Sequence, residues 1–550
     1  METPRKLLIA AMLLVGYLLF WNWQHDYGAN ATPVSAATVT PVPINSASTD
    51  LPQLHVAADS STALPVAVTA PVSIYDSGIH VSTDLMQITI SRKGGDLTDL
   101  GLTQYPIQTG SALPFQLLSD GSKTTFVAES GLIGPDGPDA AAAGRPLYQT
   151  AQNSYALSTE KNELDVVLST DYEGVHIDKT YQFKRGSYLI GLVYKVSNSS
   201  TKAWSGALFG QLKRDESGDP SAHAGMKLSS FLGAAWWTND KPYNKLPLKN
   251  FGKSPLQLSE VGGWIALVQH YFVTAWVPDH HTQVTYSTRR QGNFNYVSIV
   301  EPEVTISPGQ AQQFQMQLYA GPKIEHNLAA VSPGLDLTVD YGWLWPIAEF
   351  LFWLLNAIHA VVSNWGWSII LLTLLVKAAF WPLSAASYRS MAQMRKLAPE
   401  MARMKEQYGD DRQKLSTAMM EFYRKEKINP LGGCLPMLVQ MPVFIALYWT
   451  LMESVQLRQA GFIFWIHDLS DMDHYFILPL LMGISMFVQQ SLNPPPPDPM
   501  QAKMMKLMPA IFTVFFLFFP SGLVLYWLVS NLISIAQQWI ITKRIEAAAR

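Results

Sequence analysis

The segment Trp365–Leu383, WGWSIILLTLLVKAAFWPL, is apolar over a length that can cross a bilayer, yet it contains one cation, Lys377. The apolar core of a bilayer is about 30 Å thick, and a helix rises 1.5 Å per residue. Counted from Trp365 and Trp367, which suit a membrane interface, Lys377 lies roughly 15–18 Å deep. A charge there costs about 2.5–3.5 kcal/mol. Lys377 therefore either snorkels to the headgroups or occupies a polar cavity in a helix bundle, and the cavity is the preferred interpretation.

Apolar runs cluster at the N-terminus and after Trp343, so the chain is predicted to be a multi-span α-helical membrane protein with a large exported domain. The N-terminal run follows Arg5 and Lys6 and indicates a cleaved signal peptide or, preferably, an uncleaved anchor. The predicted spans are six in number: 1–23, 363–383, 431–455, 475–492, 505–519 and 523–541.

The segment 341–362 is apolar over most of its face but contains Glu349, Asn356 and His359. This pattern is typical of an amphipathic helix that lies in the outer membrane interface. The alternative is a further span, which would have to turn back within a few residues before the next one.

The exported part begins with 24–72, a stretch rich in Ala, Thr, Pro, Ser and Val that predicts a flexible linker. Residues 73–325 contain short runs of alternating polarity separated by turn residues, which predicts a β-sandwich-like domain. Its tryptophans, among them Trp264 and Trp276, either pack in the core or line a cleft.

Sequence motifs for nucleotide binding, metal binding and hydrolysis are missing, so no catalytic residue, metal or cofactor is predicted. Formal net charge is -3, which favours no nucleic-acid partner. The single cysteine, Cys434, cannot form an intramolecular disulfide and is predicted to be buried in an apolar helix.

Charge in the loops predicts the topology. The loop 384–430 is rich in lysine and arginine, whereas 456–474 has Arg458 beside three aspartates. Because cytoplasmic loops have the excess of cations, 384–430 and both termini, including the tail 542–550, are predicted to be cytoplasmic. Residues 24–342 then lie in the periplasm of a bacterium with two membranes.

The cytoplasmic loop 384–430 has apolar residues at spacings of three and four on both sides of a turn at Gly409, which predicts an antiparallel helical hairpin. Pro399 is expected to kink its first helix. The apolar stripe is either the seam between the two helices or a soft surface for apolar substrate segments. Met394, Met401 and Met404 are the candidates for guiding substrate.

Polar residues on the predicted spans could wet a cavity around Lys377, although each could instead make a helix-packing hydrogen bond. These candidates are Thr373, Gln440, Ser485, Gln489, Thr513, Asn531, Ser534 and Gln538.

The stretches 428–470 (INPLGGCLPMLVQMPVFIALYWTLMESV and onward), 498–532 (DPMQAKMMKLMPAIFTVFFLFFPSGLVLYWLVSNL) and NWGWSIILLTLLVK before Ala378 closely resemble the YidC family of membrane protein insertases. The resemblance implies five core helices around a hydrophilic groove, in which a positive residue attracts the substrate. Lys377 stands where the family usually has arginine, which keeps the charge but loses the planar fork. The resemblance also implies that Trp527 touches substrate.

Partners implied by the same resemblance are nascent membrane proteins, the lipid bilayer, the Sec translocon and the translating ribosome. Two other classes stay open. A secondary transporter would also hold a cation inside the membrane, but the sequence has no inverted repeat. A membrane-anchored periplasmic sugar-binding or envelope protein would use the β domain as its active part.

Overall fold

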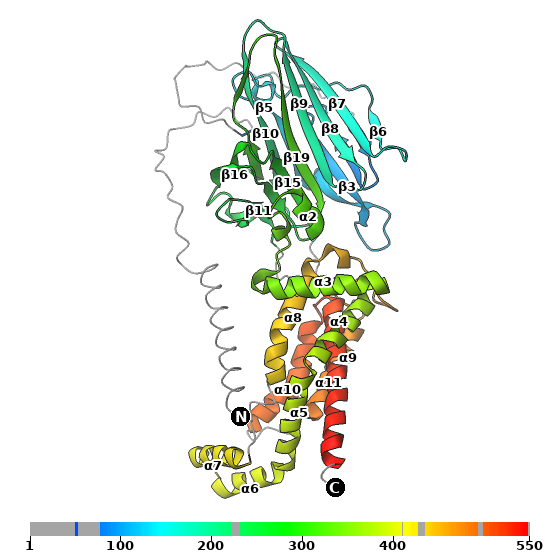
Figure 1. The fold of residues 1–550 in the computed structure, drawn as a ribbon, viewed down its shortest axis with the longest axis vertical. Helices are drawn as coiled ribbons and strands as arrows, with labels where there is room; N and C mark the ends of the chain where they lie inside the picture. Colours follow the sequence, from blue (N-terminus) through cyan, green and yellow to red (C-terminus); the bar gives the residue numbers. More distant parts are fainter. Residues whose placement is uncertain are drawn as a thin grey trace. The chain divides into compact units, whose positions relative to one another are not determined.

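The computed structural model describes residues 50–52, 78–221, 231–409, 411–426, 435–492 and 499–547. The predicted anchor 1–23, most of the predicted linker 24–72, and Cys434 lie outside these residues. The chain divides into two compact units (Figure 1). A β unit comprises Thr49–Val339 with Ser454–Gln459, and a helical unit includes Asp340–Glu453 and Ala460–Arg550.

The described part of the β unit contains two large, mostly antiparallel sheets. The 11-stranded sheet has the order β13-β16-β17-β10-β5-β4-β3-β2-β1-β6, with β18 paired to β10, and the 8-stranded sheet has the order β12-β11-β14-β15-β19-β9-β8-β7. The strands of the first sheet are β1 Ile79–Ser82, β2 Met86–Ile90, β3 Leu97–Pro106, β4 Pro114–Asp120, β5 Thr125–Ile133, β6 Ser154–Ala156, β10 Trp204–Asp215, β13 Gln257–Val261, β16 Gln283–Gln291, β17 Phe294–Val300 and β18 Val304–Ile306. Those of the second are β7 Glu163–Tyr172, β8 Val175–Lys184, β9 Leu189–Asn198, β11 Gly233–Trp236, β12 Asn244–Pro247, β14 Ile265–Val268, β15 Phe272–Pro278 and β19 Ala311–Pro322.

Alternation of polarity produces this sandwich. Along β8, buried and more exposed side chains alternate from Val175 to Lys184, so one face turns to the core. Trp264 and Trp276 are fully buried, so they pack in the core and do not line a cleft. The predicted β-sandwich domain is confirmed.

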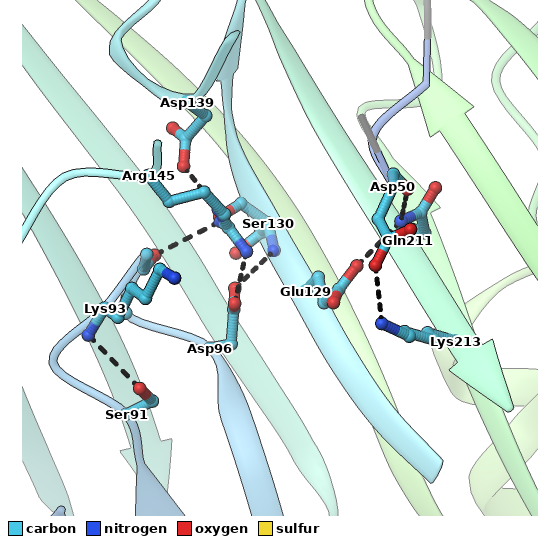
Figure 2. A network of polar contacts seen from close by, with 12 residues as sticks. Asp50, Ser91, Lys93, Asp96, Glu129, Ser130, Asp139, Arg145, Gln211 and Lys213 are labelled. Atoms are coloured by element: carbon cyan, nitrogen blue, oxygen red, sulfur yellow. Dashed lines mark hydrogen bonds and ion pairs between the residues drawn. The ribbon is translucent and has the colours of Figure 1, made fainter. Parts of the chain in front are cut away.

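The β unit contains a network of charged side chains around Arg145 (Figure 2), and Lys179 connects it to the second sheet. Arg145 pairs with Asp139 at 2.8 Å and also with Asp96. Lys179, on β8, is fully buried, and its ammonium donates to the carbonyl oxygen of Ser130 on β5 at 3.1 Å. Burial lowers the pKa of Lys179 to about 7 and raises the pKa of Asp139. Each charged group of this network is therefore stabilised by the polar and charged groups around it.

Residues 50–52, which belong to the predicted flexible linker, pack against the β unit. Leu51 is buried and packs with four residues of the β unit, Ile133, Ala207, Phe209 and Val300. Asp50 accepts a hydrogen bond from Lys213 at 2.8 Å, and Gln211 donates to the Asp50 carbonyl (Figure 2). The low charge of this stretch predicts an unpacked chain, but one leucine fits an apolar site on the sheet and fastens the segment there.

The helices of the two units follow. In the β unit, α2 is Glu325–Val331. In the helical unit they are α3 Trp345–Val362, α4 Trp365–Ala379, α5 Trp381–Lys396, α6 Ala398–Tyr408, α7 Arg412–Lys425, α8 Leu435–Glu453, α9 Ile477–Ser491, α10 Pro499–Phe516 and α11 Ser521–Ala547. Helix α11 packs against α4, α5 and α9, while α3 lies across one end of the other helices (Figure 1).

The predicted span 363–383 is not one straight helix. Helix α4 ends at Ala379, α5 begins at Trp381, and the two are bent by 66°. Pro382 lacks a backbone N–H and cannot continue α4 without a clash, so it stands in the first turn of a new helix. Lys377 is therefore in the last turn of α4, beside a bend, instead of in the middle of a helix.

The structure does not confirm the count of six spans. Within the described residues, Gly342–Val362 and Ser521–Ile545 are long and apolar enough to cross a membrane, and the bent pair α4–α5 could form a third span. Helix α9 is apolar but short, with 15 residues. Helix α10 contains Lys503 and Lys506 in its first half, which lowers its hydropathy.

The predicted kink at Pro399 is wrong in detail, because the helix is broken there. Helix α5 ends at Lys396 and α6 starts at Ala398, so Pro399 occupies the first turn of α6, where its missing N–H costs no hydrogen bond. The antiparallel pair is α6 and α7. Met391 belongs to α5 and packs against Ile541 and its neighbours on α11.

Candidate functional site

Lys377 lies inside the helical unit, where three helices meet. Its side chain is buried, with 7% exposure, and its ammonium donates to Gln440 Oε1 of α8 at 3.0 Å and to Ser534 Oγ of α11 at 2.8 Å. Both acceptors come from helices far from α4 in sequence. The ammonium therefore turns into the bundle and does not snorkel toward a surface.

Helix α11 orients the acceptors of Lys377. Gln440 donates through its amide nitrogen to Ser530 Oγ at 2.9 Å, which leaves its carbonyl oxygen facing the lysine. The amide nitrogen also lies 3.4 Å from the hydroxyl of Tyr526. Ser534 donates to the carbonyl oxygen of Ser530 at 2.8 Å. We call Lys377, Gln440, Ser530 and Ser534 the polar centre.

No carboxylate of the described residues neutralises the charge of the polar centre. Among the described residues no aspartate or glutamate forms an ion pair with Lys377, and its two partners are a neutral amide and a neutral hydroxyl. A small pocket lined by Val376, Lys377, Phe380, Leu383, Ser384, Val439 and Gln440 opens beside it, between α4, α5 and α8. A buried cation with neutral partners can accept an anionic group from outside the bundle.

The other predicted groove residues described here make contacts outside the polar centre. Thr373 and Thr513 donate to carbonyls one turn earlier in their own helices, at 2.6 and 2.7 Å. Asn531 donates to Ser485 of α9 at 3.1 Å. Trp527 packs edge-on against Phe444, with 4.5 Å between ring centroids. The two threonine hydroxyls are thus satisfied within their own helices, while Asn531 and Trp527 make contacts between helices. Out of the predicted set, the structure brings together Lys377, Gln440 and Ser534.

Sequence reasoning missed Ser530 and Tyr526, although a signal exists for them. Tyr526, Ser530 and Ser534 recur at intervals of four along α11, so they share one face of the helix. A polar stripe on a membrane helix predicts a buried polar contact.

The methionines of the predicted substrate-guiding surface are half-buried. Met394 is on α5, while Met401 and Met404 are on α6. Met419, on α7, is buried. The hairpin thus has both a buried seam residue and partly exposed methionines.

The outer faces of α9 and α10 are apolar. Large exposed hydrophobic side chains follow helical spacing on them: Leu480, Ile484 and Phe487 on α9, and Leu507, Ile511 and Val514 on α10. Apolar surface of this extent is stable in contact with lipid. The fold and site define a class: a helical membrane protein with a polar, positively charged interior and a large β-sandwich domain.

Comparison with known proteins specifies the class. Residues 357–548 match the family model described as 60Kd inner membrane protein, and residues 78–354 match the YidC periplasmic domain. The chain is 51% identical over 581 residues to the membrane protein insertase YidC of Pseudomonas aeruginosa PAO1, with 100% of each chain covered. It is 52% identical over 562 residues to the protein of that name from Pseudomonas putida F1, covering 100% of this chain and 99% of the relative.

Among solved structures, the chain is similar to an active YidC insertase crystal structure with the first transmembrane domain resolved. The TM-score is 0.39 at 17% identity, over 84% of this chain and 92% of that one. On the sequence matches, the chain belongs to the YidC family of membrane protein insertases. It is an inner membrane protein with a periplasmic domain.

Proposed function

We propose that this insertase receives the acidic or polar segment of an arriving membrane protein at its polar centre. The observation that carries the proposal is that the ammonium of Lys377 is buried with only neutral partners among the described residues. A substrate carboxylate can replace one of these neutral acceptors and form a charge-assisted hydrogen bond. The polar centre would thereby shorten the apolar path that a polar segment must cross.

The apolar part of the substrate supplies the driving force in this proposal. Transfer of apolar surface from water to lipid releases about 25 cal/mol per Å², so no nucleotide hydrolysis is needed. The exposed apolar stripes on α9 and α10 would let a substrate helix move sideways into the bilayer. In this proposal the polar centre binds the polar segment of the substrate, and the apolar segment enters the lipid.

The topology belongs to the same proposal. We infer six spans, with the loop 384–430 and both termini in the cytoplasm and residues 24–342 in the periplasm. The excess of lysine and arginine in 384–430 supports this orientation. Helix α3 supports an interfacial position, because it lies across the end of the other helices and exposes Trp345, Phe350 and Trp353 (Figure 1). The Sec translocon and the translating ribosome are proposed partners on the family resemblance.

Reconstitution tests the proposed function. Purified protein in liposomes should insert a small membrane protein with an acidic tail, whereas liposomes without it should not. A variant lacking most of 75–320 should retain insertion, because the polar centre lies entirely in the helical unit. Loss of all insertion in a deletion variant whose helical unit remains folded would favour the alternative in which the β unit is the active part.

The hairpin gives a separate prediction. If the methionine surface guides substrate, replacing Met394, Met401 and Met404 together with alanine should lower the insertion rate while folded protein in the membrane stays near the parental amount. The reason is that these side chains are only half-buried, so little packing is lost. Quantitative immunoblotting and insertion into liposomes measure the two quantities.

Met419→Ala is the control for the hairpin, because it truncates a buried seam residue and should reduce folded protein first. If the triple variant behaves like Met419→Ala, with folded protein and insertion falling in parallel, the stripe is a seam and guides nothing.

A further inference from the structure

A cleft of about 500 Å³ opens in the β unit, far in sequence from the polar centre. Its lining comes from the β15–β16 turn, the segment after β17, and β19: Asp279, Thr282, Glu301, Pro302, Val304, Gln312, Gln313, Phe314 and Gln315. Its size is in the range of pockets that bind a small molecule or a few residues of a peptide.

Glu301 is the unusual residue of the cleft. Its side chain is buried, with 9% exposure, yet no hydrogen bond or ion pair of its carboxylate is found among the described residues. Its backbone N–H donates to the carbonyl oxygen of Leu208 at 2.9 Å, so the main chain holds the residue in place. Burial, and then the nearby charge of Asp279, raise the pKa of Glu301 to about 7.

An unpaired buried carboxylate costs stability unless something compensates it. The lining of the cleft includes no lysine or arginine, and Asp279 adds a second negative charge. The donor set does not suit a resident metal ion, since the described residues contain no cluster of three or more potential ligands. A cation presented by another molecule would supply the partner that the described residues do not.

The remaining lining suits a polypeptide. Gln312, Gln313 and Gln315 offer amide donors and acceptors, which match the N–H and C=O groups of an extended backbone. Phe314 is buried, with 5% exposure, and packs against Trp204, so it offers no open ring face on which a sugar could stack. The lining thus favours a peptide over a carbohydrate.

We propose that this cleft binds an arginine or lysine side chain presented by an extended polypeptide segment, with Glu301 as the buried anion that pairs with it. The partner is an exported chain or an exposed loop of another protein. The inference goes beyond membrane insertion, because it concerns the β unit alone and requires no part of the polar centre.

Fluorescence anisotropy on the full-length protein in detergent tests the proposal. The probes are two labelled peptides of equal length, one with arginine and one with glutamine at the central position, measured at pH 8 and physiological salt. The arginine peptide should bind the parent protein, and Glu301→Gln should weaken it by about tenfold or more, as expected for a lost charge-assisted hydrogen bond. Binding should also weaken below pH 7, as Glu301 takes up a proton.

Glu303→Gln is the matched control, because this neighbouring carboxylate accepts a hydrogen bond from Ser205 and does not line the cleft. It should leave binding unchanged. Equal loss in Glu303→Gln, equal binding of the glutamine peptide, or competition by a neutral oligosaccharide but not by free arginine amide would overturn the proposal.

Thermal unfolding separates a binding role from a structural one. The folded-state pKa of Glu301 lies above its unfolded value, so the ionised group destabilises the fold at pH 8. Glu301→Gln should therefore unfold at the parental temperature or higher. An earlier unfolding of this variant would show that the carboxylate serves the fold, and the proposal would fail.

Discussion

Lys377→Ala is expected to lower the insertion rate of acidic-tailed substrates by about tenfold or more, which corresponds to the loss of one charge-assisted hydrogen bond. Lys377→Arg should retain activity, since arginine keeps the charge and resists deprotonation. Lys377→Glu should be at least as damaging as alanine, because it repels the substrate carboxylate. Insertion into liposomes, with equal amounts of folded protein, measures these rates.

Two comparisons isolate the role of the charge. Ser368→Ala removes another buried hydroxyl from α4. This hydroxyl donates to the carbonyl oxygen of Asn364, one turn earlier in the chain, so its loss should leave insertion unchanged. A substrate whose tail carboxylates are neutralised should be insensitive to Lys377→Ala. If alanine supports insertion as well as lysine for several acidic-tailed substrates, the ammonium of Lys377 has no part in receiving them. Alanine would then merely relieve the insertion cost of about 2.5–3.5 kcal/mol.

Part of the polar centre could be predicted from the sequence. A lysine inside an apolar run is costly in lipid, so its burial among polar groups follows from energetics. The hydrogen-bond partners of Lys377 could not be predicted, because only the packing of three helices brings Gln440 and Ser534 close to it. Threonines such as Thr373 can satisfy their hydroxyls within their own helix, and no pattern in the sequence distinguishes them from residues that face a cavity.

The limits of prediction are similar for the backbone. Alternating polarity is a local signal, and it correctly predicts the β-sandwich. The break at Phe380 could also have been inferred, since Pro382 follows it directly. The docking of Leu51 could not, because its partners Phe209 and Val300 lie far along the chain and only the completed sheet creates its site. The charges around Arg145 are equally scattered in sequence and form no motif.

Arg145→Met is expected to destabilise the β unit by about 3–5 kcal/mol, the usual cost of removing one member of a buried ionic network. Arg145 is the shared partner of Asp96 and Asp139, and its guanidinium also donates to the carbonyl oxygen of Ser130 at 2.8 Å (Figure 2). Without it two buried carboxylates would lose their cation. Thermal unfolding of the full-length protein, monitored by circular dichroism of the β signal, measures the change.

The control and the pH dependence make this prediction specific. Lys184→Met breaks an exposed pair with Glu163, whose side chains are both 67% exposed, and should cost less than about 1 kcal/mol. In Arg145→Met the pKa of Asp139, already raised by burial, should rise further. The free-energy penalty for the charge of Asp139 is then present above that pKa and fades as the pH falls through it. The unfolding temperatures of variant and parent should therefore converge as the pH is lowered. Adding Asp139→Asn should recover part of the loss at pH 8. Equal effects of Arg145→Met and Lys184→Met would mean that the network contributes no more than a surface ion pair.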